Sequence, residues 1–236
     1  MRVARLRCKR WIVLLAAFAL AGCGASEKAP PPSPASAAAT NRPAPVAAPA
    51  ADTRPEVVVL GDSLTAGLGL DPADAFPTLL QQKIDAAGLE FHVSNAGVSG
   101  DTSAGGLSRL DWALGGRPSI LVVALGGNDA LRGLPAAELS RNLSAIIEKA
   151  QARNIRVILA GMEAPPNFGQ DYFVSFHDVY PALARKYQVP LVPFLLQDVA
   201  GITALNQRDG IHPTAEGARI VANNVWAVLG PMLKAS

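Results

Sequence analysis

Two kinds of apolar pattern alternate along residues 56–236. Short continuous runs of β-branched and other apolar residues are typical of strands that are buried on both faces. Longer segments repeat their apolar residues every three or four positions, which predicts amphipathic helices. The strand-like runs are residues 57–60, 91–97, 119–129, 156–162 and 189–194. The helix-like segments are residues 74–88, 103–114, 134–154, 172–188 and 214–233.

This alternation predicts an α/β domain built as a three-layer α/β/α sandwich, flavodoxin-like, with a parallel sheet of about five strands. Proline weakens two of the elements. The helix over residues 172–188 must tolerate or kink at Pro181, and the strand over residues 189–194 is interrupted by prolines. In such a sheet the ligand site lies beyond the carboxyl ends of the strands.

The first 22 residues have a different pattern. A basic segment that ends at Arg10, a short apolar stretch and small residues before Cys23 are typical of a secretory signal peptide. The sequence LAGC, residues 20–23, resembles a bacterial lipobox, which implies cleavage before Cys23 and lipid on its thiol. A plain signal peptide followed by a chance cysteine is the alternative.

Residues 24–55 are rich in Ala, Pro and Ser and contain almost no large apolar side chain. Such a composition cannot build a core and is typical of an extended, disordered tether. We therefore expect a signal peptide over residues 1–22, a lipidated tether over residues 23–55 and one globular domain over residues 56–236.

Removal of the signal peptide changes the charge of the chain. The whole sequence has a formal net charge of +2, but five basic residues and no acidic ones lie in residues 1–22. The remaining chain carries 16 basic and 19 acidic residues, a net charge of −3, and argues against a nucleic-acid partner. Since no cysteine follows Cys23 and no histidine pair has metal-ligand spacing, we expect neither a metal nor a cofactor.

Polar residues and glycines gather where predicted strands end or a late helix begins. The segments are GDS at residues 61–63, NAGVSGDTS at 95–103, GGND at 126–129 and DGIHP at 209–213. Because the carboxyl ends of parallel strands meet at one edge of the sheet, we expect the segments to lie together. Taken singly, Ser63 could be a helix cap, and Asp209 with His212 could be a turn at a helix entry.

A serine becomes a nucleophile only with a base within hydrogen-bond reach, and a histidine base needs a carboxylate to orient it. Among the three histidines, His92 lies in a predicted strand and His177 in a predicted helix. His212 lies in a loop, three residues after Asp209 and across a glycine, so one loop can bring both groups to Ser63.

The segments GDSLTAGLG, NAGVSGDTSAGG, LGGND and DGIHP resemble, in order and spacing, the four blocks of the SGNH (GDSL) hydrolase superfamily over residues 57–233. The likeness is greatest to the periplasmic thioesterase, lysophospholipase and arylesterase branch. The resemblance implies a serine esterase that forms an acyl-enzyme on Ser63, with His212 as base and Asp209 orienting it. It also implies an oxyanion hole made by the Ser63 and Gly100 amides and the Asn128 side chain.

We expect the neighbouring residues to have structural roles and not catalytic ones. Asp62 is expected to hydrogen-bond loop amides, Asp129 to brace its loop, and residues 101–103 to cap a helix. His92 and His177 are expected to be structural or surface residues. Several apolar loop residues could line an acyl groove, unless they only pack the loops; these are Leu131, Leu134, Pro165, Pro166 and Phe168.

The expected partners are a small acyl ester, a thioester or a lysophospholipid, together with the membrane through the lipid anchor. A carbohydrate acetylesterase of the same superfamily and a non-catalytic, envelope-binding lipoprotein are the alternatives. Gly24 rather than Asp follows Cys23. By resemblance to sorting signals of bacteria with two membranes, this indicates the outer membrane, with the domain facing the periplasm.

Overall fold

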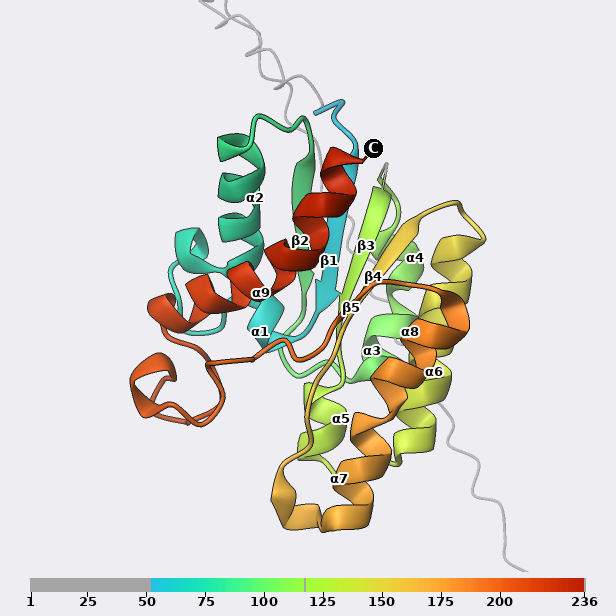
Figure 1. The fold of residues 1–236 in the computed structure, drawn as a ribbon, viewed down its shortest axis with the longest axis vertical. Helices are drawn as coiled ribbons and strands as arrows, with labels where there is room; N and C mark the ends of the chain where they lie inside the picture. Colours follow the sequence, from blue (N-terminus) through green and yellow to red (C-terminus); the bar gives the residue numbers. More distant parts are fainter. Residues whose placement is uncertain (1–51, 117, 236) are drawn as a thin grey trace, which may run out of the picture. The chain divides into compact units, whose positions relative to one another are not determined.

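The computed structural model describes residues 52–116 and 118–235 (Figure 1). The predictions for the signal peptide, for Cys23 and for the tether up to residue 51 lie outside these residues. All described residues belong to one compact unit that begins at Ala50.

Five parallel strands form one sheet in the order β2-β1-β3-β4-β5. The strands are β1 (Glu56–Gly61), β2 (His92–Gly97), β3 (Pro118–Ala124), β4 (Arg156–Ala160) and β5 (Leu191–Val192). The chain moves from β1 to one side of the sheet and then returns past it to build the other side. The carboxyl ends of β1 and β3 therefore mark the topological switch point, where open α/β sheets place their ligands.

Helices cover both faces of this sheet (Figure 1). One face is covered by α2 (Phe76–Ala86) and α9 (Ala215–Lys234), and the other by α3 (Ser103–Ser108), α4 (Leu110–Ala113), α6 (Ala136–Gln151) and α8 (Val179–Tyr187). Three short helices lie toward the carboxyl ends of the strands: α1 (Ser63–Ala66), α5 (Gly127–Leu131) and α7 (Gln170–His177). Three 3-10 turns, η1 (Pro72–Asp74), η2 (Pro166–Phe168) and η3 (Thr203–Leu205), complete the described elements. The three-layer α/β/α prediction is confirmed.

The core lies between the sheet and these two helical layers. The central strands β1 and β3 have fully buried apolar runs, Val57–Leu60 and Ile120–Val123. In α6 the buried residues are those that the helical spacing predicts: Leu139, Leu143, Ile146, Ile147 and Ala150. Among the described residues, no helix has the length and apolar character needed to cross a membrane.

Two predicted helices are each divided in the structure. Residues 172–188 form α7 and α8, which separate at Asp178. The cause is Pro181, because its ring cannot donate a helical hydrogen bond and would collide with the carbonyl of residue 177. Residues 103–114 form α3 and α4, which separate at Arg109, where the backbone leaves helical geometry. Prolines on both sides of Leu191–Val192 limit β5 to two residues.

Candidate active site

The turn from β1 into α1 places Ser63 at the switch point. Asp62 caps α1, and its Oδ1 accepts a hydrogen bond from the Leu64 amide at 3.0 Å. Ser63 is the first helical residue and is partly exposed. The turn needs glycine at position 61, since a Cβ there would lie 1.9 Å from Thr65 Oγ1. The tight geometry therefore presents the Ser63 hydroxyl at the edge of the sheet.

His212 approaches Ser63 from a loop 149 positions further along the chain. Its Nε2 lies 2.8 Å from Ser63 Oγ, and its Nδ1 lies 2.7 Å from Asp209 Oδ2. The second Asp209 oxygen accepts the amides of Ile211 at 2.9 Å and His212 at 3.0 Å. These hydrogen bonds, led by the one from the His212 amide, lower the pKa of Asp209 to about 2. The carboxylate is thus ionised at neutral pH and bonded to the ring nitrogen that faces away from Ser63.

Two further loops reach the same edge. Asn128 lies in α5, directly after β3, and its Nδ2 donates to the Asp101 carbonyl at 2.9 Å and to Asp62 Oδ2 at 3.3 Å. Gly100 follows β2 with φ at +86°, a conformation that favours glycine. The side chain of Arg132 donates to its carbonyl at 2.8 Å.

Arg109 joins the loop after β2 to the end of β1. Its Nε donates to Asp101 Oδ2 at 2.6 Å, and its Nη2 donates to the Gly61 carbonyl at 2.8 Å. This contact was not predicted from the sequence, because nothing in the helical spacing of residues 103–114 distinguishes an arginine that turns inward. The loops that carry Gly100 and Ser63 are consequently fixed to each other.

Asp62 is buried beside the serine. Burial raises the pKa of its carboxyl to about 6, although the Leu64 amide and the nearby His212 act in the opposite direction. Its hydrogen bond goes to the Leu64 amide in the first turn of α1, so Asp62 has a structural part, as a helix cap and not through the loop amides expected from the sequence.

The other flanking residues also make structural contacts. Asp129 is buried and accepts from the Ser103 amide and hydroxyl, at 2.7 and 2.6 Å, so it braces its loop. Thr102 caps α3 through the Gly105 amide. His177 contacts Glu163 Oε1 at 2.7 Å and lies largely exposed.

A cavity of about 320 Å³ opens beside Ser63 and His212. Its remaining wall is largely apolar and consists mainly of Leu131, Met162, Ala164, Pro165, Phe194, Leu196, Ala200 and Ile211. Two of the residues predicted to line an acyl groove, Leu131 and Pro165, are part of this wall. Leu134, Pro166 and Phe168 are not part of it. The Leu134 carbonyl instead accepts from Tyr172 Oη, and the Phe168 ring packs at 5.3 Å from the Tyr172 ring.

Most of this wall was not predicted from the sequence. Met162 follows β4 closely and Phe194 follows β5, so both lie beyond strand ends, but their residue types do not distinguish them from core residues. Glu163, an acidic residue in this wall, was not predicted either. One carboxylate oxygen of Glu163 contacts His177, whereas Oε2 is buried without a hydrogen-bond partner among the described residues.

Comparison with known proteins agrees with this geometry. The sequence matches the GDSL-like Lipase/Acylhydrolase family over residues 59–220. It is 43% identical over 178 residues to "Esterase TesA" of Pseudomonas aeruginosa, covering 75% of this chain and 89% of that protein. It is 37% identical over 185 residues to "Thioesterase 1/protease 1/lysophospholipase L1" of Escherichia coli, covering 78% and 86%.

A solved structure shows the same fold. The psychrotrophic esterase EstA from Pseudoalteromonas sp., in a form inhibited by monoethylphosphonate, superposes with a TM-score of 0.72 at 33% identity, covering 76% of this chain and 98% of that one. With the family match spanning all four polar segments, the chain belongs to the GDSL (SGNH) hydrolase family, in its TesA-like branch, and is a serine esterase that hydrolyses carboxylic ester bonds.

Proposed function

We propose that Ser63 is the nucleophile of this esterase and that His212 and Asp209 activate it. His212 Nε2 takes the proton of the Ser63 hydroxyl as Oγ attacks the ester carbonyl, and then delivers that proton to the leaving alcohol or thiol. Water next attacks the acyl-enzyme, again with His212 as base. Asp209 holds the ring in the tautomer that leaves Nε2 free to accept, and stabilises the imidazolium that forms.

The tetrahedral oxyanion would be held by the amides of Ser63 and Gly100 and by the Asn128 side chain. Asn128 Nδ2 has two hydrogens, and the bond to the Asp101 carbonyl uses one of them at 2.9 Å. The contact with Asp62 is longer, at 3.3 Å. The oxyanion replaces that longer contact, so little reorganisation is needed as charge develops.

The cavity favours an acyl chain as the group held beside Ser63. Its predominantly apolar wall can bury methylenes, whereas a sugar ring would leave its hydroxyls without partners there. We infer that the substrates are acyl esters and thioesters, with aryl esters and lysophospholipids among them. The observation that carries this proposal is the 2.8 Å contact between Ser63 Oγ and His212 Nε2 at the mouth of that cavity.

The test uses purified protein from residue 24 onward and nitrophenyl esters with acyl chains of two to twelve carbons. Wild-type protein should hydrolyse them and react covalently with a fluorophosphonate at Ser63. Ser63→Ala should lose both properties, and Ser99→Ala, in a neighbouring loop, should keep both. Full activity of Ser63→Ala contradicts the assignment, and rapid deacetylation of acetylated xylan beside inert acyl-chain substrates contradicts the substrate class.

We also propose that Cys23 carries lipid and holds the enzyme on the outer membrane, facing the periplasm. The LAGC sequence at residues 20–23, the basic and apolar segments before it and Gly24 after it support this proposal. Cys23→Ser should move the enzyme from the membrane to the soluble fraction of a cell extract. Retention of Cys23→Ser in the membrane fraction would contradict lipid anchoring.

A further inference from the structure

Every strand of the sheet is followed by a loop or short helix that carries an exposed large apolar side chain. The side chains are Leu68 after β1, Val98 after β2, Leu131 after β3, Phe168 after β4 and Ile202 after β5, and Ile211 joins them from the loop of His212. These six residues, here called the apolar rim, are between 41% and 47% exposed. Two other exposed large apolar side chains among the described residues are Trp112 and Val174.

The rim continues into the cavity. Leu131 and Ile211 belong to both, since each lines the cavity wall and is also more than 40% exposed. An acyl chain that enters the cavity across these residues keeps contact with apolar surface along its path. Clustered exposed apolar side chains are typical of a surface that another apolar phase or partner covers.

Cations accompany the rim. Arg132 directly follows Leu131, and Arg208 lies in the same loop as Ile211. Neither arginine makes an ion pair within the described part of the chain, although Arg132 donates to the Gly100 carbonyl. Apolar side chains with adjacent arginines match a phospholipid surface, where phosphates lie just outside the acyl region.

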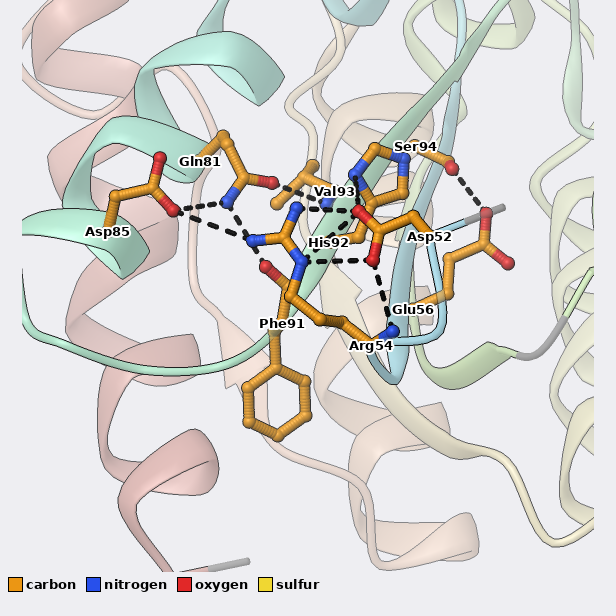
Figure 2. Close-up of polar contacts among 9 residues, drawn as sticks. All are labelled: Asp52, Arg54, Glu56, Gln81, Asp85, Phe91, His92, Val93 and Ser94. Atoms are coloured by element: carbon orange, nitrogen blue, oxygen red, sulfur yellow. Dashed lines mark hydrogen bonds and ion pairs between the residues drawn. The ribbon is translucent and has the colours of Figure 1, made fainter. Parts of the chain in front are cut away.

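The tether joins the domain at the opposite edge of the sheet. Arg54 donates from Nε to Asp52 Oδ1 at 3.0 Å and from Nη2 to Asp52 Oδ2 at 2.6 Å, and its Nη1 lies 3.8 Å from Asp85 of α2 (Figure 2). His92, the first residue of β2, lies 3.5 Å from Asp52. The hydrogen bonds from Arg54 lower the pKa of Asp52 to about 2, so the pair is charged at neutral pH. These contacts fix residues 52–54 beside the amino ends of β1 and β2, whereas the rim lies beyond their carboxyl ends.

The tether is long enough to span this distance. Six residues of β1 at ~3.3 Å each separate the two edges by about 20 Å, to which the loops add. The 29 residues from Cys23 to Ala51 reach at most ~90 Å as polyproline II and about 30 Å as a flexible chain. An anchor in the membrane therefore permits the domain to turn its catalytic edge toward that membrane.

We propose that the apolar rim docks on the surface of a phospholipid bilayer, so that the enzyme takes acyl-chain substrates directly from the membrane. This inference rests on the proposed esterase function and names where its lipid substrates enter. Leu68, Ile202 and their neighbours insert among the headgroups, Arg132 and Arg208 meet phosphates, and the cavity opens toward the acyl chains.

The test measures vesicle binding by protein from residue 24 onward in a Ser63→Ala background, which prevents hydrolysis. Binding to sucrose-loaded vesicles of phosphatidylcholine and phosphatidylglycerol is followed by sedimentation. Leu68→Ser combined with Ile202→Ser removes two rim side chains outside the main cavity wall and should weaken binding by at least about tenfold. Trp112→Ser is the matched control, because Trp112 is 75% exposed but lies on α4, away from the rim.

Three results would overturn the inference. The protein with an intact rim could fail to bind vesicles, the double variant could bind them as tightly as that protein does, or Trp112→Ser could weaken binding as much as the double variant does. Loss of a dimer in the double variant with unchanged vesicle binding would assign the rim to a second copy of the chain instead. A second measurement distinguishes failure of this inference from failure of the proposed function. It follows hydrolysis of nitrophenyl acetate by proteins that retain Ser63. The double variant should match wild type there, whereas an inactive wild type would refute the esterase proposal and leave the binding result standing.

Discussion

Asp209 uses its two oxygens for different purposes. Oδ1 accepts two backbone amides that shape the loop, and Oδ2 contacts His212 Nδ1. Asp209→Asn can keep the Oδ1 bonds but presents a donor to the ring, which favours the wrong tautomer of His212. We expect kcat to fall by up to ~10⁴ with the fold intact.

The pH profile checks this interpretation of Asp209. Because the pKa of Asp209 is about 2, its carboxylate is ionised throughout the range from pH 5 to 9, so titration of Asp209 itself should add no pH dependence to the activity of the wild type in that range. Circular dichroism and thermal unfolding serve as controls for the fold. Full activity of Asp209→Asn at neutral pH would show that His212 does not need this carboxylate.

Asp62 should make the protein less stable as the pH rises. The pKa of its carboxyl is about 6 in the folded protein and 3.8 in an unperturbed chain. Between these values the folded state binds a proton that the unfolded state has released, so the free energy of unfolding falls as the pH rises from about 4 to 6. From pH 4 to pH 7, Asp62→Asn should therefore gain stability relative to wild type, by about 2 kcal/mol.

Urea unfolding at the two pH values measures this difference for Asp62→Asn. The substitution also changes the contact with Asn128, but a loss of stability that does not depend on pH is the same at both pH values. It therefore cancels when the two free energies of unfolding are compared. Asp71→Asn is the matched control, since Asp71 also caps a helical turn, through the Ala73 amide, but is exposed. An equal change with pH in Asp71→Asn would show that burial is not the cause.

Glu163 places a charged group in a largely apolar cavity. Apart from Asp62 and His212, no other described residue that lines this cavity is ionisable. Glu163→Leu should raise kcat/KM for the octanoate relative to the acetate nitrophenyl ester by roughly tenfold, because an acyl chain then meets no carboxylate in the cavity wall. His177→Asn removes only the contact outside the cavity wall and should leave this ratio near the wild-type value; a matching change would locate the effect in α7 instead.

At the scale of elements, α1 depends on close contact with β2. A Cβ on Gly97 would lie 2.3 Å from the Ala66 amide nitrogen, so Gly97→Ala must displace α1 and with it Ser63. We expect a loss of about 1–3 kcal/mol in stability and at least a tenfold loss in kcat. Gly88→Ala is the control: its Cβ would meet nothing within 4 Å, so it should lose stability only through its positive φ and keep kcat.

Elements whose apolar residues repeat with a clear helical or strand period could be predicted from the sequence. Elements whose ends depend on local contacts could not. The buried face of α6 follows from spacing alone, because five apolar residues repeat along sixteen positions. The division at Asp178 and the short β5 depend on how each proline meets its neighbours. The helices α1 and α5 have four and five residues, too few to show a period, and they carry Ser63 and Asn128.

The candidate site could be located because its chemistry lies in the residue types that follow the strands. Ser63, Asn128 and His212 are polar residues at strand ends or in a late loop, and the rule for parallel sheets brings them to one edge. Met162 and Phe194 could not be distinguished from core residues, since an apolar side chain looks the same in a cavity wall and in a packed interior. The arginine contacts of the oxyanion loops depend on side-chain direction, which a sequence pattern does not contain.

At the scale of the whole molecule, the proposed lipid on Cys23 leads to a prediction: the length of the segment before Asp52 should determine whether the enzyme can use the membrane that holds it. Deletion of residues 29–48 leaves nine residues before Asp52, Cys23 included, which reach at most ~28 Å. That reach barely exceeds the span of β1, and the loops and α1 add to the distance that the tether must cover. In vesicles that contain lysophosphatidylcholine, the shortened protein, carrying the proposed lipid on Cys23, should lose most hydrolysis of that lysophospholipid and keep hydrolysis of nitrophenyl acetate.

A Gly/Ser segment of the same length as residues 29–48 provides the matched control. It restores the reach without restoring the sequence, so it should recover hydrolysis of the membrane lipid. High dilution of the vesicles prevents one vesicle from supplying substrate to enzyme on another. The shortened protein could instead hydrolyse lysophosphatidylcholine as fast as the full chain does. That result would show that hydrolysis does not require the catalytic edge to face the membrane that holds the enzyme. The enzyme would then take its substrate from another membrane or from solution.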